Sequence, residues 1–262
     1  MINTNRGTIE TATKPTKDTS VLGKSPVLLV IDVQHDFMDS DGAVPCPATS
    51  AAGGTKEVIA NVHRLVNAAK ISKIPTIFTK ETHRPSLIDL GRELDGDEPR
   101  HCIDQTKGTT ILEELGADRL AENQYLIPKR RYSAFIGTDL VFLLNAFKAD
   151  TLVLTGAATN VCVHYTGADA HQYDYRIKVV EEATAGTSPE AHKAALQSLE
   201  YLQHGAIVHL HEVVEAMKSF RPSAKRLTQI SCGLSCLLYI LGHYPTPAGD
   251  WGCSVSLCSN LW

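Results

Sequence analysis

Short apolar runs alternate with segments of helical periodicity along most of this chain. Residues 26–31 read Pro-Val-Leu-Leu-Val-Ile and contain no polar side chain, which is typical of a strand buried on both faces. Residues 55–70 repeat apolar side chains at helical spacing and predict an amphipathic helix, and residues 75–79 predict a second strand. The chain therefore begins its regular structure with a strand, a helix and a strand.

The same alternation continues downstream. Strands are expected near residues 125–127, 151–155, 177–180 and 206–208, and helices near 138–148, 160–172 and 189–202. Such an order predicts an α/β fold, a doubly wound and mostly parallel sheet with helices on both faces, in three layers. Sheets of this kind place their sites beyond the carboxyl ends of the strands, where the strand order reverses.

The two ends of the chain differ from this central part. Residues 1–24 are polar and aperiodic and predict a disordered leader, so that the globular domain is expected at 25–220. Residues 221–262 form an atypical cysteine-rich extension. Its pairs Cys232/Cys236 and Cys253/Cys258 match common structural-zinc spacings poorly. The loop-rich stretch 83–108 is a candidate lid, although a loop of this length can also form an oligomer interface.

Composition narrows the function classes. The chain has 262 residues, 43% hydrophobic and 21% charged, with a net charge of −4, and no stripe of basic and aromatic residues that would favour nucleic acid. No apolar run approaches the roughly 20 residues that cross a membrane. Seven irregularly spaced cysteines suggest a reduced, cytoplasmic protein. A small polar or neutral molecule is the expected partner.

Three residues with useful chemistry follow three of the predicted strands. Asp32 follows the first, Lys129 follows the strand near 125–127, and Cys162 lies at an apparent helix start after 151–155, where the helix dipole favours a thiolate. Asp32 could accept the thiol proton, Lys129 could stabilise the thiolate, and Cys162 could attack a carbonyl carbon. The backbone N–H groups of Ala158 and Cys162 could hold the resulting oxyanion.

Each of these residues also has an ordinary structural interpretation. A free cysteine is often a small buried hydrophobe, and an aspartate after a strand can cap a helix or form a turn. A lysine in a loop is usually a solvated cation. Taken singly, the structural interpretations are at least as strong as the catalytic ones.

Three spaced motifs in this order resemble the isochorismatase-like cysteine hydrolases. They are Asp32-Val-Gln-His-Asp-Phe37, Lys129-Arg-Arg-Tyr-Ser-Ala-Phe135 and Gly156-Ala-Ala-Thr-Asn-Val-Cys-Val163. The resemblance covers residues 25–217 and implies a doubly wound α/β fold, a catalytic triad of Asp32, Lys129 and Cys162, a cis peptide between Ala157 and Ala158, and a homo-oligomer, dimer or tetramer.

Further segments resemble the biuret-hydrolase branch of that family, among them His83-Arg-Pro85, Asp89-Leu-Gly-Arg-Glu-Leu-Asp-Gly96 and Tyr201-Leu-Gln-His-Gly-Ala206. This resemblance implies that Phe37 lines the pocket and that Gln203 binds a carbonyl or amide of the ligand, with Arg131 as a weaker candidate. Asn160 departs from the branch, which has an acidic residue there, and matches the ureidoacrylate branch instead.

The sequence therefore predicts a cysteine-dependent amidohydrolase that cleaves a C–N bond of a small linear carbamoyl or ureido compound, biuret first, through a thioester and with release of ammonia. The thiol mechanism needs no cofactor, and no closed ligand set for a metal is evident, because only Glu81 and His83 are adjacent and His101 is separated by a loop. The alternatives are a ureidoacrylate or carbamoylsarcosine amidase, an isochorismatase, or a noncatalytic ligand-binding protein of the same fold.

Overall fold

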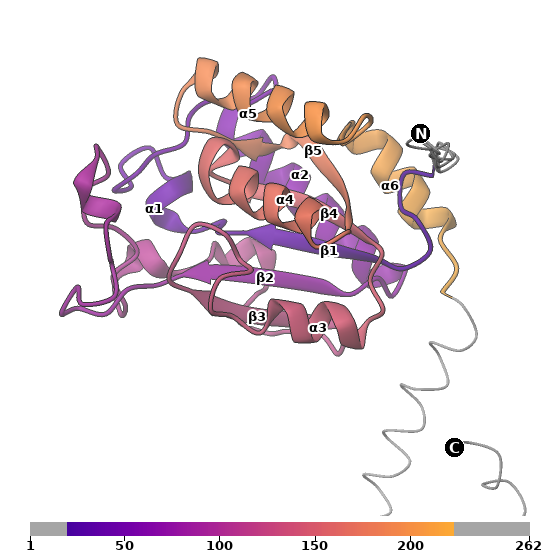
Figure 1. Cartoon of the computed structure of the whole chain (residues 1–262), viewed down its shortest axis with the longest axis horizontal. Helices are drawn as coiled ribbons and strands as arrows, with labels where there is room; N and C mark the ends of the chain where they lie inside the picture. The colour runs from indigo at the N-terminus through magenta and orange to yellow at the C-terminus, as the bar shows by residue number, and fades with distance from the viewer. Residues whose placement is uncertain (1–19, 223–262) are drawn as a thin grey trace, which may run out of the picture. The chain divides into compact units, whose positions relative to one another are not determined.

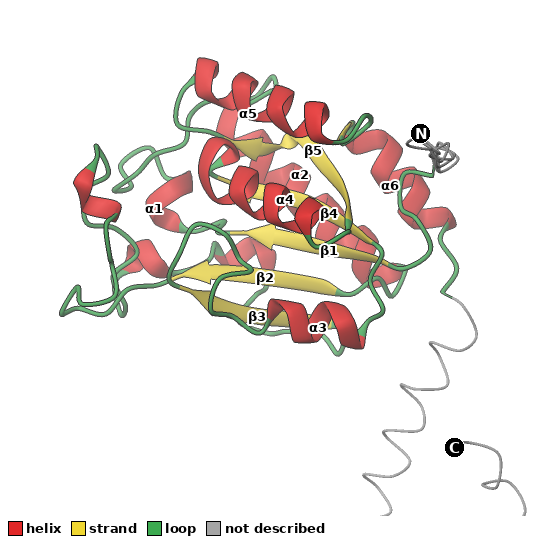
Figure 2. Cartoon of the chain, in the orientation of Figure 1, coloured by secondary structure: helices red, strands yellow, loops and turns green. Residues whose placement is uncertain are grey.

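A six-stranded parallel sheet forms the centre of the protein (Figure 2), in a computed structural model that describes residues 20–222. The strand order is β3-β2-β1-β4-β5-β6, and every described pairing is parallel. The strands are β1 Pro26–Ile31, β2 Thr76–Glu81, β3 Gln124–Lys129, β4 Thr151–Ala157, β5 Arg176–Ala185 and β6 Ile207–Val208. The predicted doubly wound α/β fold is confirmed.

Helices cover both faces of this sheet (Figure 1). Helices α2 (Gly54–Ile71) and α6 (Leu210–Ser219) pack on one face against a core that includes Leu28 and Val30. Helices α3 (Leu140–Ala146), α4 (His164–Gln172) and α5 (Pro189–Leu202) pack on the other face against Val27 and Leu29. Successive residues of β1 thus enter opposite cores, which explains its continuous apolar sequence.

Several elements extend beyond their predicted bounds. β2 continues to Glu81 and β5 to Ala185, past charged residues that seemed to mark strand ends. The structure also contains the short helix α1 (His35–Met38) and the helix α6, neither of which was predicted. Helix α5 has the predicted bounds, because the Ser188 hydroxyl caps its amino end by accepting from the Ala191 N–H and Pro189 occupies its first turn.

The strand order reverses between β1 and β4, since the chain adds β2 and β3 on one side and β5 and β6 on the other. Gly156 in β4 pairs with Ile31 at this point and has φ 113. A Cβ atom there would lie 1.9 Å from the Ile31 carbonyl oxygen, so only glycine allows the two strand ends to approach. A site is therefore expected at the ends of β1 and β4.

The described chain begins before the predicted domain boundary at residue 25. Leu22 is buried in the core, and the N–H groups of Lys24 and Ser25 donate to the Asp150 carboxylate. The cysteine pairs at 232/236 and 253/258 lie outside the described residues. Within residues 20–222, no helix is both long and apolar enough to span a membrane.

Candidate active site

Four chemically active side chains meet at the carboxyl edge of the sheet. Asp32 follows β1, Glu81 ends β2 and Lys129 ends β3, while Cys162 lies in the π-helical turn Thr159–Val163 that follows β4. In the register of β2 and β3, Glu81 pairs directly with Lys129. The topology thus brings together residues that are far apart in the sequence, such as Asp32 and Cys162.

Lys129 is at the centre of this group. Its Nζ lies 2.7 Å from Asp32 Oδ2, 2.6 Å from Glu81 Oε2 and 3.3 Å from Cys162 Sγ. The exposed fractions are 1% for Lys129, 0% for Asp32 and 3% for Cys162. A buried ammonium is tolerated only when it is paired, and here each of its three protons has an acceptor. The solvated-loop interpretation of Lys129 is wrong.

Asp32 is held by local contacts as well as by the ion pair. Its backbone has φ 47, a left-handed conformation that aspartate adopts more readily than most residues. The Thr79 hydroxyl donates to Oδ1 at 2.6 Å, and Oδ2 faces the Lys129 ammonium at 2.7 Å. An oxygen of Asp32, an oxygen of Glu81 and the Cys162 sulfur all lie within 4.8 Å of one another. The carboxylate of Asp32 therefore lies close to the thiol as well as to Lys129.

Glu81 was considered from the sequence only as a metal ligand, yet it is part of this centre. Its Oε2 lies 3.5 Å from Cys162 Sγ. The Gln34 amide fixes its backbone by accepting from the Glu81 N–H at 2.7 Å and donating to the Glu81 carbonyl at 2.8 Å. The sequence signal that identifies Glu81 is its register opposite Lys129, which becomes visible only once β2 is extended to residue 81.

The buried charges determine the resting protonation states. Burial is the largest influence on the Cys162 pKa and raises it well above its usual range, although the Lys129 charge opposes this. Burial also raises the pKa of Asp32. Burial alone would raise the pKa of Glu81, but Lys129 and the neighbouring histidines hold it well below its usual range. Burial and the two neighbouring carboxylates therefore act on the Cys162 pKa in the direction opposite to the one expected from the helix start.

A second cluster adjoins Glu81. His83 Nε2 and His101 Nε2 lie 3.1 and 2.9 Å from Glu81 Oε1, and His83 Nε2 lies 3.2 Å from Glu93 Oε2. Single ligand atoms of Glu81, His83, Glu93 and His101 all lie within 4.8 Å of one another, and all four residues are buried. The structure thus assembles a set of nitrogen and oxygen donors that the spacing along the sequence did not reveal, because Glu93 and His101 come from the loop 83–108.

These four residues fit a divalent cation. Two imidazoles and two carboxylates are suitable ligands for zinc or manganese, and Glu93 Oε1 has neither a hydrogen bond nor an ion pair with the described residues. Without a metal the same contacts favour imidazolium. Burial lowers the pKa of both histidines, but hydrogen bonds to Glu81 and, for His83, also to Glu93 outweigh it and raise each pKa to about 9.

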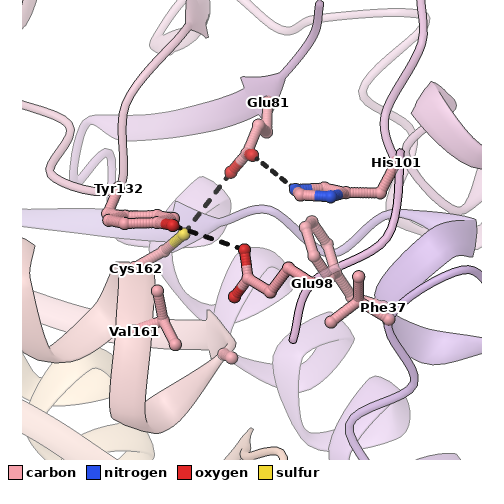
Figure 3. Close-up of a pocket in the computed structure, with 9 residues that line it drawn as sticks. Phe37, Glu81, Glu98, His101, Tyr132, Val161 and Cys162 are labelled. Carbon is pink, nitrogen blue, oxygen red and sulfur yellow. Dashed lines mark hydrogen bonds and ion pairs between the residues drawn. The ribbon is translucent and has the colours of Figure 1, made fainter. Parts of the chain in front are cut away.

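A small pocket opens onto the Cys162 sulfur (Figure 3). It is lined by Phe37, Val44, Glu81, Glu98, His101, Tyr132, Ala158, Val161 and Cys162. Phe37 and both predicted oxyanion residues, Ala158 and Cys162, thus lie at the pocket, and the Ala157–Ala158 peptide is cis.

Two predicted substrate-binding residues lie elsewhere in this chain. The Gln203 amide accepts from the Ile177 N–H at 3.0 Å and donates to the Ile177 carbonyl at 2.8 Å, at the amino end of β5. Helix α5 runs back across the sheet, so its last turn is at the edge opposite the pocket. Arg131 is exposed and donates to the Asp89 carbonyl at 2.7 Å. Both side chains position backbone and do not line the pocket.

Comparisons with known proteins agree with this geometry. A probable inactive nicotinamidase of Arabidopsis thaliana is 33% identical over 178 residues, covering 65% of this chain and 86% of that protein. A ureidoacrylate amidohydrolase of Yersinia enterocolitica is 30% identical over 189 residues, covering 66% and 81%. A pyrazinamidase of Pyrococcus horikoshii, solved in complex with zinc, superposes with a TM-score of 0.59 at 29% identity, covering 71% of this chain and 99% of that one.

The family model for the isochorismatase domain matches residues 26–213, from the first residue of β1 into helix α6. This range contains the whole sheet and each residue of the centre around Lys129. By the extent of that match, the chain belongs to the isochorismatase-like cysteine hydrolase family.

Proposed function

We propose that this chain is a cysteine amidohydrolase that cleaves the C–N bond of a small amide or ureide. The observation that carries the proposal is the buried centre in which Lys129 Nζ lies 3.3 Å from Cys162 Sγ and 2.7 Å from Asp32 Oδ2, beside a pocket. An ion pair that served stability alone would not require a thiol as the third partner of the Lys129 ammonium. Amidohydrolases among the relatives support the same reaction class.

The reaction begins with the neutral thiol. Cys162 transfers its proton to Asp32 Oδ2 as the sulfur attacks the carbonyl carbon, so that a C–S bond forms and the carbonyl oxygen becomes an oxyanion. Backbone N–H groups of Ala158 and Cys162 stabilise that oxyanion. Lys129 keeps its proton, since the acidic groups around it outweigh burial and raise its pKa well above the usual value. Its charge offsets the negative charge that moves between sulfur and carboxylate.

The C–N bond then breaks. Asp32 returns the proton to the leaving nitrogen, ammonia departs, and a thioester remains on Cys162. Asp32 next takes a proton from water, which attacks the thioester carbonyl and releases a carboxylic or carbamic acid with the thiol restored. A divalent cation held by Glu81, His83, Glu93 and His101 would supply a Lewis acid at the pocket wall.

Two observations bear on the identity of the substrate. Motif resemblance favours a biuret-like ureide, while the relatives support a ureidoacrylate-type amidase more directly. Both compounds contain a terminal carbamoyl nitrogen that leaves as ammonia. The common proposal is therefore a small linear ureide, with nicotinamide-type amides as the next class.

Ammonia release from a panel tests the proposal. We expect turnover of biuret or ureidoacrylate above that of nicotinamide, carbamoylsarcosine and isochorismate. Cys162→Ala and Cys162→Ser should each lose at least about a thousandfold in kcat while keeping the fold. Iodoacetamide should inactivate the wild type, and substrate should protect it. Undiminished turnover in Cys162→Ala would exclude covalent catalysis by this thiol.

A noncatalytic protein is the second candidate, because one relative is named a probable inactive nicotinamidase. The intact set of Asp32, Lys129 and Cys162 opposes it. Ligand binding without product, together with a Cys162 that does not react with iodoacetamide, would favour this candidate over the hydrolase.

A further inference from the structure

The polar side chains around the pocket differ in how many of their hydrogen bonds are already made within the protein. Lys129, directly behind the pocket, uses all three protons on Asp32, Glu81 and Cys162. His101, in the pocket wall, directs Nε2 to Glu81 at 2.9 Å and Nδ1 to the Pro99 carbonyl at 2.8 Å. Neither cation therefore has an N–H left for a ligand.

Glu98 is the exception. It comes from the loop 83–108 and lies across the pocket from Cys162 (Figure 3). Its Oε2 accepts from the Tyr132 hydroxyl at 3.4 Å, a long contact, and among residues 20–222 no Lys, Arg or His forms an ion pair with it. Burial is the main influence on the Glu98 pKa and raises it; the charge of His101 opposes this, while the neighbouring Glu81 and Glu93 act in the same direction as burial.

The two arginines that follow Lys129 have other partners. Arg130 Nε lies 2.8 Å from Asp89 Oδ2, and Arg131 donates to the Asp89 carbonyl. Neither arginine lines the pocket. The remaining walls are largely apolar, formed by Phe37, Val44, Ala158 and Val161. A ligand in this pocket therefore meets an unsatisfied acceptor, Glu98, and no lining Lys, Arg or His with a free side-chain N–H.

We infer that Glu98 is a specificity-determining residue, which accepts N–H groups of an uncharged amide or ureide and excludes substrates that carry a carboxylate. A carbamoyl NH₂ offers two donors to such an acceptor, whereas a carboxylate meets like charge in a small, partly desolvated space. The inference rests on the proposed function and refines it, since it favours biuret-like ureides over ureidoacrylate.

Alkylation of Cys162 tests the inference without depending on the identity of the substrate. Iodoacetamide is neutral and iodoacetate is an anion, and both form an S–C bond with loss of iodide. The rate at Cys162 is measured for each reagent by peptide mass spectrometry on the full-length protein. Each rate is divided by the rate of the same reagent with glutathione, which removes intrinsic reactivity.

Three proteins are compared: the wild type, Glu98→Gln and Asp97→Asn. Glu98→Gln removes the charge and keeps an oxygen that accepts from Tyr132. Asp97→Asn is the matched control, because it removes the same charge from an adjacent exposed position outside the pocket. We expect Glu98→Gln to raise the iodoacetate-to-iodoacetamide ratio by about tenfold, and Asp97→Asn by less than about twofold.

An equal ratio in the wild type and Glu98→Gln would overturn the inference, as would the same change in Asp97→Asn. The iodoacetamide rate of Glu98→Gln serves as the control for an intact pocket. If neither reagent modifies Cys162, the proposed function itself fails. An unchanged ratio on a Cys162 that does react overturns the inference alone, so the two failures are distinguishable.

The turnover of a charged and a neutral substrate provides a second test. Ureidoacrylate and its methyl ester differ by one charge, and the wild type should have the higher kcat/KM for the ester. Glu98→Gln should reduce that preference by about tenfold, mainly through KM. A wild type that prefers the free acid, with a preference unchanged in Glu98→Gln, would contradict a role for Glu98 in selection.

Discussion

At the scale of single residues, the centre around Lys129 illustrates how charge is tolerated inside this protein. Asp32, Glu81 and Lys129 are each at most 1% exposed. The protein tolerates these buried charges because each one is paired with a neighbour of opposite charge. Removal of one member leaves the others without compensation, which costs more free energy than the intact set contributes. Stability therefore depends on all three side chains, two of which, Asp32 and Lys129, also act in the proposed mechanism.

Replacement of Lys129 by methionine, of similar length but uncharged, should lower the free energy of unfolding by about 3–5 kcal/mol, because two buried carboxylates lose their cation. Denaturant unfolding measures this change. The double variant Lys129→Met with Glu81→Gln should recover part of the loss, since one uncompensated charge is removed. Equal stability of the single and double variants would show that Glu81 is not coupled to Lys129.

Three of the four residues at the centre could be predicted from the sequence, but their environments and the place of Glu81 could not. Asp32, Lys129 and Cys162 follow recognisable strands, so topology alone brings them together. Glu93 and His101 lie in an irregular loop with no periodicity, and only the folded loop brings them to Glu81. The same limit applies to Gln203, because the path of α5 decides which edge its last turn reaches.

At the scale of elements, the close approach of β1 and β4 sets the position of both Asp32 and the turn that carries Cys162. Gly156 permits that approach, and its φ of 113 is accessible essentially only to glycine. The strand bounds were predicted well where the sequence is apolar throughout, as in β1. They were predicted too short in β2 and β5, because charged residues such as Glu81 are paired within the fold and do not end the strand.

Gly156→Ala should lower the free energy of unfolding by about 3 kcal/mol or more, because its Cβ would lie 1.9 Å from the Ile31 carbonyl oxygen and the backbone would also be strained. Gly54→Ala is the matched control. Gly54 has φ 68 but nothing within 4 Å of a Cβ, so a loss of only about 1 kcal/mol is expected. Similar losses in both variants, measured by chemical denaturation, would argue against the close approach as the cause.

Asn160, the position that departs from the biuret-like motifs, anchors the turn that carries Cys162. Its Nδ2 donates to the Thr187 hydroxyl at 2.9 Å, and its Oδ1 accepts from the Thr187 N–H at 3.0 Å. It does not line the pocket. The departure therefore concerns the support of the turn and does not bear directly on the choice of ureide.

Asn160→Asp should change stability by less than about 1 kcal/mol and leave the order of substrate preference unchanged. The Thr187 hydroxyl can rotate and donate to the second carboxylate oxygen, and the bond from the Thr187 N–H is kept. Asn160→Leu loses both bonds and should cost about 1–3 kcal/mol. A reversal of preference between biuret and ureidoacrylate in Asn160→Asp would assign this position a direct role in selection.

At the scale of the whole molecule, two apolar cores separated by the sheet hold the described chain together. One joins α2 and α6 to the sheet, and the other joins α3, α4 and α5 to it. The homo-oligomer implied by the family resemblance stays a prediction, which sedimentation of the full-length protein can test. A second test concerns the residue at which the two cores end along the chain.

The last described side chains that are buried are Val213 and Met217 in α6, and the Ser72 hydroxyl donates to the Met217 carbonyl at 2.5 Å. A chain that stops after Arg221 keeps all of these contacts. We therefore expect its Tm to stay within about 2 °C of the full-length value, with unchanged ammonia release. A chain that stops after His209 loses α6 and exposes the core beneath it, so it should not unfold cooperatively. A large loss of Tm or turnover on removal of residues 222–262 alone would instead make that segment part of the folded enzyme.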